Sequence, residues 1–333
     1  MKLWQTIDGL EDDLKQVERY LEELAQAPEE WASLSAVLSS SAVQRGKRLR
    51  PALVLLTGRL GPDYPACRDR LCRAAAMVEL AHAASLIHDD IVDDSPLRRG
   101  RPTVQSRFGK DMAVYAGDFL LSRLFLFLME QDMGRCGLLL ARCMSDMCCG
   151  EIRQYQAQFN TEATEEAYFE SLLGKTASLF AVSCELGALE SGCGPKDMES
   201  LREFGRNLGV LFQLRDDLLD FTSSQQAEGK PVHSDFKQGL YTLPVLHGFQ
   251  DPDVGPLLKE AARQVQRDGS DALCARMEEL VARSGGIAYA VSVMEQYERQ
   301  ARCLLETLPP NPILKRMDSM IHKLVPGACR KPV

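Results

Sequence analysis

The chain has 333 residues, of which 45% are apolar and 26% charged, a globular composition that excludes a disordered chain. A net charge of -8 argues against nucleic acid as the main partner, and the lack of an uninterrupted apolar run of about 18 residues predicts no membrane span. The 11 cysteines lack zinc-site spacing, so we expect reduced thiols in a cytoplasmic protein without a secretory signal.

Apolar residues recur at helical spacing along most of the chain. The first stripe, with apolar residues three or four positions apart, consists of Ile7, Leu10, Leu14, Val17, Leu21 and Leu24. The same spacing predicts further helices over residues 53–60, 71–91, 112–129, 138–159, 168–189 and 201–221. Strand signals are nearly absent. The pattern predicts an all-α fold, a large helical bundle formed by a single domain over residues 1–333.

Two acidic clusters follow apolar helical stretches: LIHDDIVDD at residues 86–94 and FQLRDDLLDF at residues 212–221. Each contains Asp-Asp-x-x-Asp, whose first and last aspartates lie on one helix face, about 5–6 Å apart. Such carboxylates repel one another unless a cation lies between them, and their hard oxygens suit Mg²⁺ bridged to substrate phosphates. The pattern predicts a metal site, with a solvated acidic helix end as the alternative.

Basic residues accompany the acidic clusters in four stretches: GKRLRP at 46–51, SPLRRGRPT at 95–103, LLGKTAS at 172–178 and GKPVHSD at 229–235. Arginine offers phosphate a planar fork and lysine a point charge. Each stretch alone is more typical of a solvated loop, but together they predict a polyanion held by metal and arginine. His82, two turns before Asp90 on a face of small apolar residues, is a further candidate.

These stretches resemble the signature motifs of the trans-isoprenyl diphosphate synthases, also called polyprenyl synthetases. The likeness extends through ELAHAASLIHDDIVDDSPLRRGRPT at 79–103, AGDFLL at 116–121, GKTASLF at 174–180 and GKPVHSDFKQGLYTLP at 229–244. It implies an isoprenoid synthase fold with a central catalytic cavity and a homodimeric assembly. It also implies head-to-tail condensation, in trans geometry, of an allylic diphosphate primer with isopentenyl diphosphate, with Mg²⁺ as cofactor.

The resemblance further implies a role for each motif residue. The metal ligands would be Asp89, Asp93 and Asp216, supported by Asp90, Asp94, Asp217 and Asp220. The allylic diphosphate would contact Arg98, Lys175, Thr176, Gln213 and Lys230. Isopentenyl diphosphate would be held by Lys47, Arg50, His82 and Arg99. The catalytic residues would be Asp89, Asp93, Asp216 and Lys175, with the released diphosphate as proton acceptor.

Two positions depart from the family pattern. Arg45 replaces the first of two glycines, and Leu240 stands where many members carry a lysine that contacts diphosphate. We therefore expect weaker binding at the second acidic cluster and an unchanged reaction.

Small residues beneath the first cluster bear on product length. Ala84 and Ser85 precede Asp89 by about one helical turn, and Ala81 lies one turn further along the same face. In the family, large aromatic residues there stop growth at short products, so we expect a medium- or long-chain product. The tunnel floor would be set deeper, by Phe125, Phe127 or Met129, with plain core residues as the commoner interpretation of these three positions. The alternative is a farnesyl or geranylgeranyl diphosphate synthase.

Other interpretations stay open at this point. A class I terpene cyclase or head-to-head synthase shares the fold but lacks the GKRLRP patch. A non-catalytic partner subunit of a heteromeric polyprenyl synthase commonly loses an aspartate-rich motif, whereas both are intact here. A catalytic subunit that needs a small second protein fits the motifs equally well. A metal-buffering protein is disfavoured because the chain has no EF-hand loop.

Overall fold

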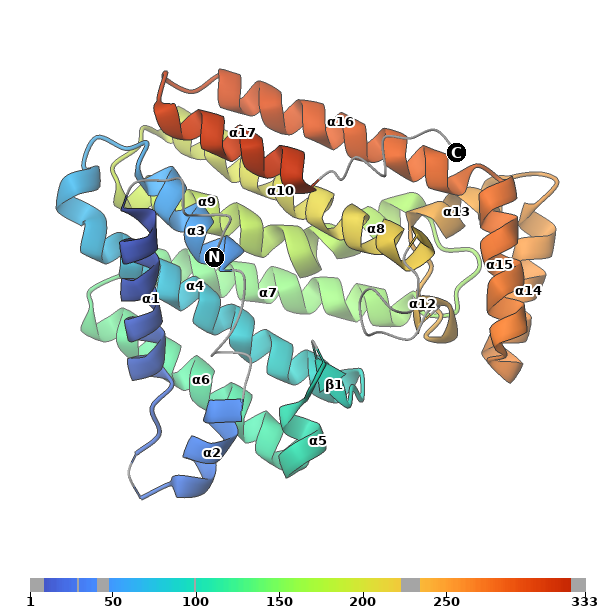
Figure 1. The fold of residues 1–333 in the computed structure, drawn as a ribbon, viewed down its shortest axis with the longest axis horizontal. Helices are drawn as coiled ribbons and strands as arrows, with labels where there is room; N and C mark the ends of the chain where they lie inside the picture. Colours follow the sequence, from blue (N-terminus) through green and yellow to red (C-terminus); the bar gives the residue numbers. More distant parts are fainter. Residues whose placement is uncertain (1–8, 29, 41–47, 99, 223–233, 325–333) are drawn as a thin grey trace. The chain divides into compact units, whose positions relative to one another are not determined.

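The computed structural model describes residues 9–28, 30–40, 48–98, 100–222 and 234–324. These residues are mostly helical, with almost no strand, which confirms the all-α prediction (Figure 1). Among them, the strands are β1 (Leu97–Arg98) and β2 (Arg101–Pro102), a minimal antiparallel hairpin in which Arg98 pairs with Arg101.

The chain divides into two compact units. The first comprises Met1–Met144, Leu179–Gly205 and Pro310–Arg316. The second comprises Ser145–Ser178, Arg206–Pro309 and Met317–Val333. Four helices contribute residues to both units: α7 (Gly134–Gln156), α9 (Ser178–Glu190, whose first residue alone belongs to the second unit), α10 (Pro195–Thr222) and α17 (Pro312–Leu324). That the two units form a single domain remains a prediction.

The first unit is built around the long helix α4 (Tyr64–Val92), against which other helices of that unit pack. Its remaining helices are α1 (Leu10–Leu24), α2 (Ala32–Ser40), α3 (Leu49–Gly58), α5 (Val104–Phe108), α6 (Lys110–Glu130) and α9 (Ser178–Glu190). Residues 74–78 of α4 are fully buried on every side of the helix. Small side chains there, including three consecutive alanines, let neighbouring helices approach closely.

One glycine makes room for a side chain between α4 and α6. A Cβ atom on Gly117 of α6 would lie 2.2 Å from Nε2 of His88 on α4, so a larger residue would displace the His88 ring. His88 Nε2 also lies 3.4 Å from Oδ1 of Asp118. The AGDFLL stretch thus contacts the helix that carries the first acidic cluster.

The predicted stripe on α1 is buried where the structure describes it, from Leu10 to Leu24. Asp13 is also buried, which the stripe did not predict, and it accepts hydrogen bonds from Arg59 (2.8 Å) and Arg68. The ion pair with Arg59 ties α1 to the end of α3.

The second unit has its own apolar core. Its helices are α8 (Glu165–Leu172), α12 (Ser234–Lys237), α13 (Leu243–Gln250), α14 (Gly255–Asp268), α15 (Asp271–Arg283) and α16 (Gly286–Glu306). Val245, Leu258, Met277 and Val281 are completely buried in this core. Directly after α8, the chain forms η2 (Leu173–Ala177), a single π-helical turn.

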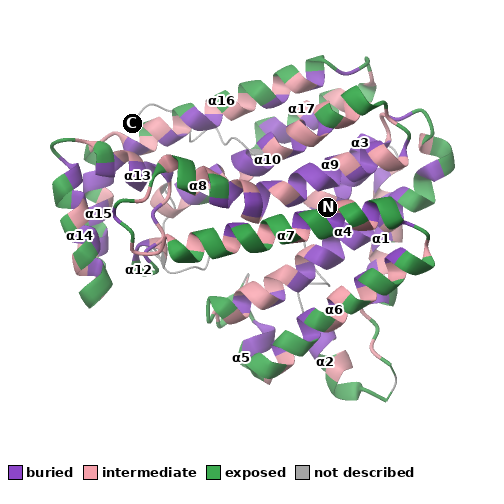
Figure 2. Cartoon of the chain, turned by 180° about the vertical axis from the view of Figure 1, so that it is seen from behind, coloured by how far each residue is buried: buried purple, intermediate pink, exposed green. Residues whose placement is uncertain are grey.

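Two stretches of the described chain, Lys110–Glu130 and Glu165–Glu190, are long and apolar enough to cross a membrane by length and composition alone. In their most apolar windows, 39% and 67% of the residues are buried. Core helices of soluble proteins meet the same criteria, so this is weak evidence for a span, and the expected absence of one remains a prediction. Exposed residues recur along α6 (Figure 2).

Candidate active site

The first aspartate-rich motif occupies the end of α4. The backbone N–H of Asp93 donates to the carbonyl of Asp89 at 2.9 Å, so the two residues are one helical turn apart, as predicted. Asp89 is half-buried, whereas Asp93 and Asp94 are exposed, and Asp94 pairs with Lys110 at 2.9 Å. The negative end of the helix dipole lies at the same place, so the site favours a cation.

Asp90 points away from solvent and binds Arg98. Nε of Arg98 donates to Oδ1 of Asp90 at 2.7 Å, linking the β1–β2 hairpin to α4. Burial raises the pKa of Asp90 above its ordinary value, although the nearby guanidinium opposes the shift. Asp90 and Arg98, which the sequence assigns to the same site, are therefore in direct contact.

Arg50 and His82 come together, as expected for two residues assigned to one substrate. Nη1 of Arg50 lies 3.0 Å from Nε2 of His82, which joins the start of α3 to α4. The Arg50 guanidinium also stacks over the ring of Phe180, 4.6 Å from its centroid. Lys47, Arg99 and Lys230, predicted to contact diphosphates, lie outside the described residues.

The second motif lies near the end of α10. Asp216 is exposed, Asp220 is half-buried and Asp217 is buried. Asp217 accepts hydrogen bonds from the hydroxyl of Tyr168 and, at 2.8 Å, from Nε2 of Gln213. Burial raises the pKa of Asp217 to about 7, despite these two donors.

Thr176 extends this network, because its hydroxyl donates to Oε1 of Gln213 at 2.9 Å. The predicted residues Thr176, Gln213 and Asp217 thus form one hydrogen-bonded chain. Tyr168, which completes the chain, was missed by sequence reasoning because it lies outside the quoted motifs.

Lys175 lies on the π-helical turn η2 and donates to the carboxylate of Glu151 on α7 at 2.9 Å. A Cβ atom on Gly150 would lie 2.3 Å from the backbone nitrogen of Lys175, so this glycine allows α7 to touch η2. Glu151 is a second residue that the sequence did not single out. A diphosphate bound at Lys175 would compete with this carboxylate for the ammonium group.

The residues assigned to product length lie on α4. Ala81 and Ala84 are buried, and Ser85 is half-buried with its hydroxyl donating to the carbonyl of His82 at 2.9 Å. The predicted deeper floor needs correction. Phe125 and Met129 are 49% and 78% exposed, so they face away from the core and cannot close a tunnel within this chain. Phe127 is half-buried, with its ring centroid 6.0 Å from that of Tyr20, and for this residue the prediction stands untested.

The first motif offers two of the ligands that a Mg²⁺ ion needs. Across the described parts of the chain, no three His, Cys, Asp or Glu side chains are grouped to hold an ion by themselves. Mg²⁺ commonly uses only one or two carboxylates together with substrate phosphates and water. Asp89 and Asp93, one turn apart on one face, meet that requirement. The two motifs belong to different units, so their sharing one metal cluster remains a prediction.

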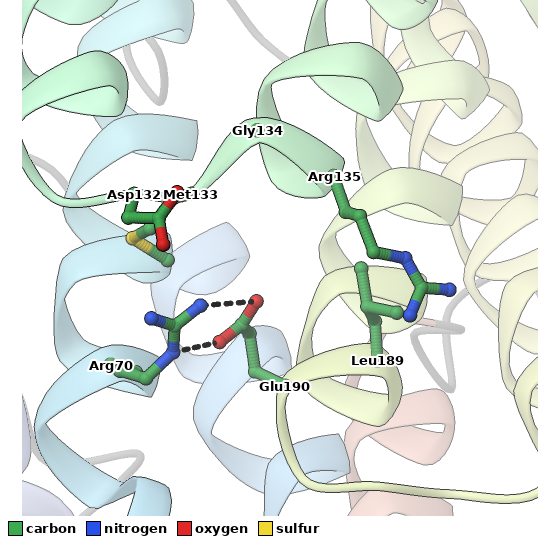
Figure 3. Close-up of a pocket in the computed structure, with 7 residues that line it drawn as sticks. All are labelled: Arg70, Asp132, Met133, Gly134, Arg135, Leu189 and Glu190. Carbon is green, nitrogen blue, oxygen red and sulfur yellow. Dashed lines mark hydrogen bonds and ion pairs between the residues drawn. The ribbon is translucent and has the colours of Figure 1, made fainter.

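A pocket of about 600 Å³ lies at the other end of α4 (Figure 3). Arg70 donates there to the nearly buried carboxylate of Glu190 at 2.6 and 3.4 Å, and the thiol of Cys136 donates to the same group at 2.9 Å. Arg70 and Asp89 are 19 positions apart on one helix, about 28 Å at 1.5 Å per residue. The pocket is therefore separate from the predicted substrate site.

Comparison with known proteins agrees with the motifs. The Polyprenyl synthetase family profile matches residues 32–279. Heptaprenyl diphosphate synthase component 2 of Geobacillus stearothermophilus is 36% identical, over 93% of this chain and 94% of that protein. Solanesyl-diphosphate synthase 2 of Oryza sativa subsp. japonica is 35% identical, over 95% and 77%.

The fold agrees as well. A polyprenyl synthase from Caulobacter crescentus CB15, crystallised with calcium and isoprenyl diphosphate, superposes with a TM-score of 0.87 at 31% identity, covering 97% of this chain and 96% of that one. With aspartate pairs at helical spacing, an adjacent arginine and matches over most of its length, the chain belongs to the polyprenyl synthetase family of trans-prenyltransferases.

Proposed function

We propose that the protein condenses an allylic diphosphate with isopentenyl diphosphate head-to-tail, in trans geometry, to give a longer polyprenyl diphosphate. The observation that carries the proposal is the Asp89–Asp93 pair at the end of α4, one turn apart, with Arg98 bound to the intervening Asp90. This arrangement combines a hard-cation site with a guanidinium suited to diphosphate oxygens.

The barrier to this reaction is charge separation as the bond between carbon and the diphosphate oxygen breaks. Mg²⁺, when bound, supplies positive charge to the diphosphate oxygens. In our proposal Arg98 and Lys175 orient the allylic diphosphate, and Arg50 and His82 hold isopentenyl diphosphate for attack on the allylic carbon. The released diphosphate accepts the proton lost from the product.

We propose a medium- or long-chain product. Small residues at Ala84 and Ser85 support this choice, as do relatives named heptaprenyl and solanesyl diphosphate synthases. The test is to incubate the purified protein with isopentenyl diphosphate, Mg²⁺ and each allylic primer in turn, and to measure product length. A product of farnesyl length or shorter would contradict the chain-length proposal, and no product with any primer would contradict self-sufficient synthesis.

We further propose a cytoplasmic homodimer joined through α6. Apolar side chains are exposed on this helix and at the start of α7: Tyr115, Phe125, Leu126, Met129 and Leu138. The cysteines within the described residues are free thiols, which suits a reducing compartment.

A second candidate assembly follows from one observation. The Geobacillus relative is named component 2, and such a name belongs to one part of a two-part synthase. If the purified chain is inactive but gains activity when a lysate of its source cells is added, it is the catalytic component of a heteromer. Activity of the purified chain alone would exclude that requirement.

A further inference from the structure

Arg48 stands two residues before Arg50 in the basic patch, yet it is directed into the protein and is only 5% exposed. Its Nε and Nη2 atoms donate to the two carboxylate oxygens of Glu18 on α1 at 2.5 and 2.8 Å. Its Nη1 atom donates to Glu79 on α4 at 2.6 Å. One guanidinium therefore ties three helices of the first unit together at the start of α3.

The backbone of Arg48 is held in an unusual conformation. Its φ and ψ are 50° and 40°, in the left-handed region, and it directly precedes the first residue of α3. A residue other than glycine keeps this conformation only where its surroundings enforce it. The bonds to the two carboxylates fix the Arg48 side chain and so hold the backbone at the start of α3 in place.

Two neighbouring links connect the start of α3 to α4. Arg48 reaches Glu79, and Arg50 reaches His82, three residues further along α4. Residues three apart on a helix are neighbours on one face, so the buried ion pair lies next to the contact assigned to isopentenyl diphosphate. A shift of α3 that broke the first link would also move Arg50 away from His82.

We propose that Glu18, Arg48 and Glu79 are positioning residues for isopentenyl diphosphate. They hold α3 against α4 so that the guanidinium of Arg50 stays beside His82. Helix α1 thereby belongs to this half of the substrate site, although none of its residues is assigned to the substrate. The inference rests on the proposed function, because it assumes that Arg50 and His82 bind isopentenyl diphosphate.

The chain offers a matched control. Asp13, on the same helix α1, is 2% exposed and pairs with Arg59 at the opposite end of α3. Asp13→Asn therefore weakens a comparable ion pair between α1 and α3 and leaves the contacts of Arg48 unchanged. A general weakening of the first unit would appear in both variants, whereas a positioning effect would appear only at the Arg48 end.

The experiment measures steady-state kinetics of Glu79→Gln, Glu18→Gln, Asp13→Asn and Arg50→Ala with both substrates. We expect Glu79→Gln and Glu18→Gln to raise the KM for isopentenyl diphosphate by about tenfold, and to change kcat and the primer KM by less than about twofold. Asp13→Asn should leave both KM values unchanged. Glu18 is part-exposed, so its variant keeps the test valid if Glu79→Gln does not fold.

Three results would overturn the inference, and they have different meanings. If Arg50→Ala raises the KM for isopentenyl diphosphate but neither glutamine variant does, the substrate site stands and the positioning role is wrong. If Arg50→Ala leaves that KM unchanged, the assignment of the half-site itself fails. Equal rises in both KM values would also refute the positioning role, because they would indicate general loosening.

Discussion

The hydroxyl of Tyr168 donates a hydrogen bond to the carboxylate of Asp217, which is buried next to the exposed Asp216. Burial raises the pKa of Asp217 from 3.8 to about 7, with Asp235 and Asp216 adding to the shift. The folded protein therefore binds this proton more tightly than the unfolded chain does. The contribution of Asp217 to the free energy of unfolding is therefore greatest below about pH 4. It falls as the pH rises toward 7 and stays low above that pH.

We accordingly expect Asp217→Asn to stabilise the metal-free protein at pH 8 relative to wild type, and to do so less at pH 5. Asparagine removes the buried charge, which is worth on the order of a few kcal/mol for a shift of this size. Its single acceptor oxygen serves one of the two donors, Tyr168 or Gln213, as that of the protonated carboxyl does. Thermal unfolding in a chelator at both pH values measures the difference. A gain of equal size at both pH values would contradict the assignment, and Asp111→Asn, at an exposed position of α6, is the control.

Asp89 and Asp93 are expected to act through metal rather than through the fold. Asp93→Ala, and separately Asp89→Ala, should lower turnover by about 100-fold or more, because the leaving diphosphate loses its charge stabilisation. The melting temperature should hold or rise slightly, since one of two like charges is gone. Activity above about a tenth of wild type would exclude direct ligation, and a large fall in melting temperature would indicate a structural role.

Ser85→Phe is the sharper test of product length. Ser85 is half-buried, whereas Ala84 has no exposed surface, so a ring at Ala84 risks overpacking that costs about 1–3 kcal/mol. We expect Ser85→Phe to shorten the product by at least one isoprene unit at nearly unchanged melting temperature. Chromatography of the dephosphorylated products gives the length. An unchanged product would show that the growing chain does not pass this residue.

The exposed apolar face of α6 should control the oligomeric state. Phe125→Glu puts a charge in the middle of this face, and we expect sedimentation to report a monomer in place of a dimer. Leu257→Glu replaces a comparably exposed residue of α14 and should leave the dimer intact. A dimer that survives Phe125→Glu would refute the proposed face.

Local spacing made part of the site predictable. The i,i+4 rule placed Asp89 and Asp93 one turn apart on one helix face, and the structure has the corresponding helical hydrogen bond. The resemblance assigned Arg50 and His82 to one substrate, and Thr176 and Gln213 to the other, and each pair is in contact. Family motifs carry this information because residues that bind one diphosphate must lie together.

Partner choice across long sequence distances was not predictable. Arg48 and Arg50 are two residues apart in one basic patch, but one is bound between Glu18 and Glu79 and the other reaches His82. Nothing in the local pattern distinguishes them, because the difference arises from where α1 packs. Phe125 and Met129 were misjudged for a related reason: an apolar residue on a helix can face a core or an exposed surface, and composition alone does not decide which.

The π-helical turn at Leu173–Ala177 has a consequence for how this segment tolerates mutation. A π turn holds one residue more than an α turn, so the loss of a single codon there would convert it to regular helix and be absorbed locally. Tyr168 on α8 would still reach Asp217, while the side chains of Lys175 and Thr176 would point in other directions. A codon lost within α8 would instead rotate all side chains on one side of the gap by about 100°. The turn is thus a place where a one-residue deletion would yield a folded protein without the residues that we propose to bind the allylic diphosphate.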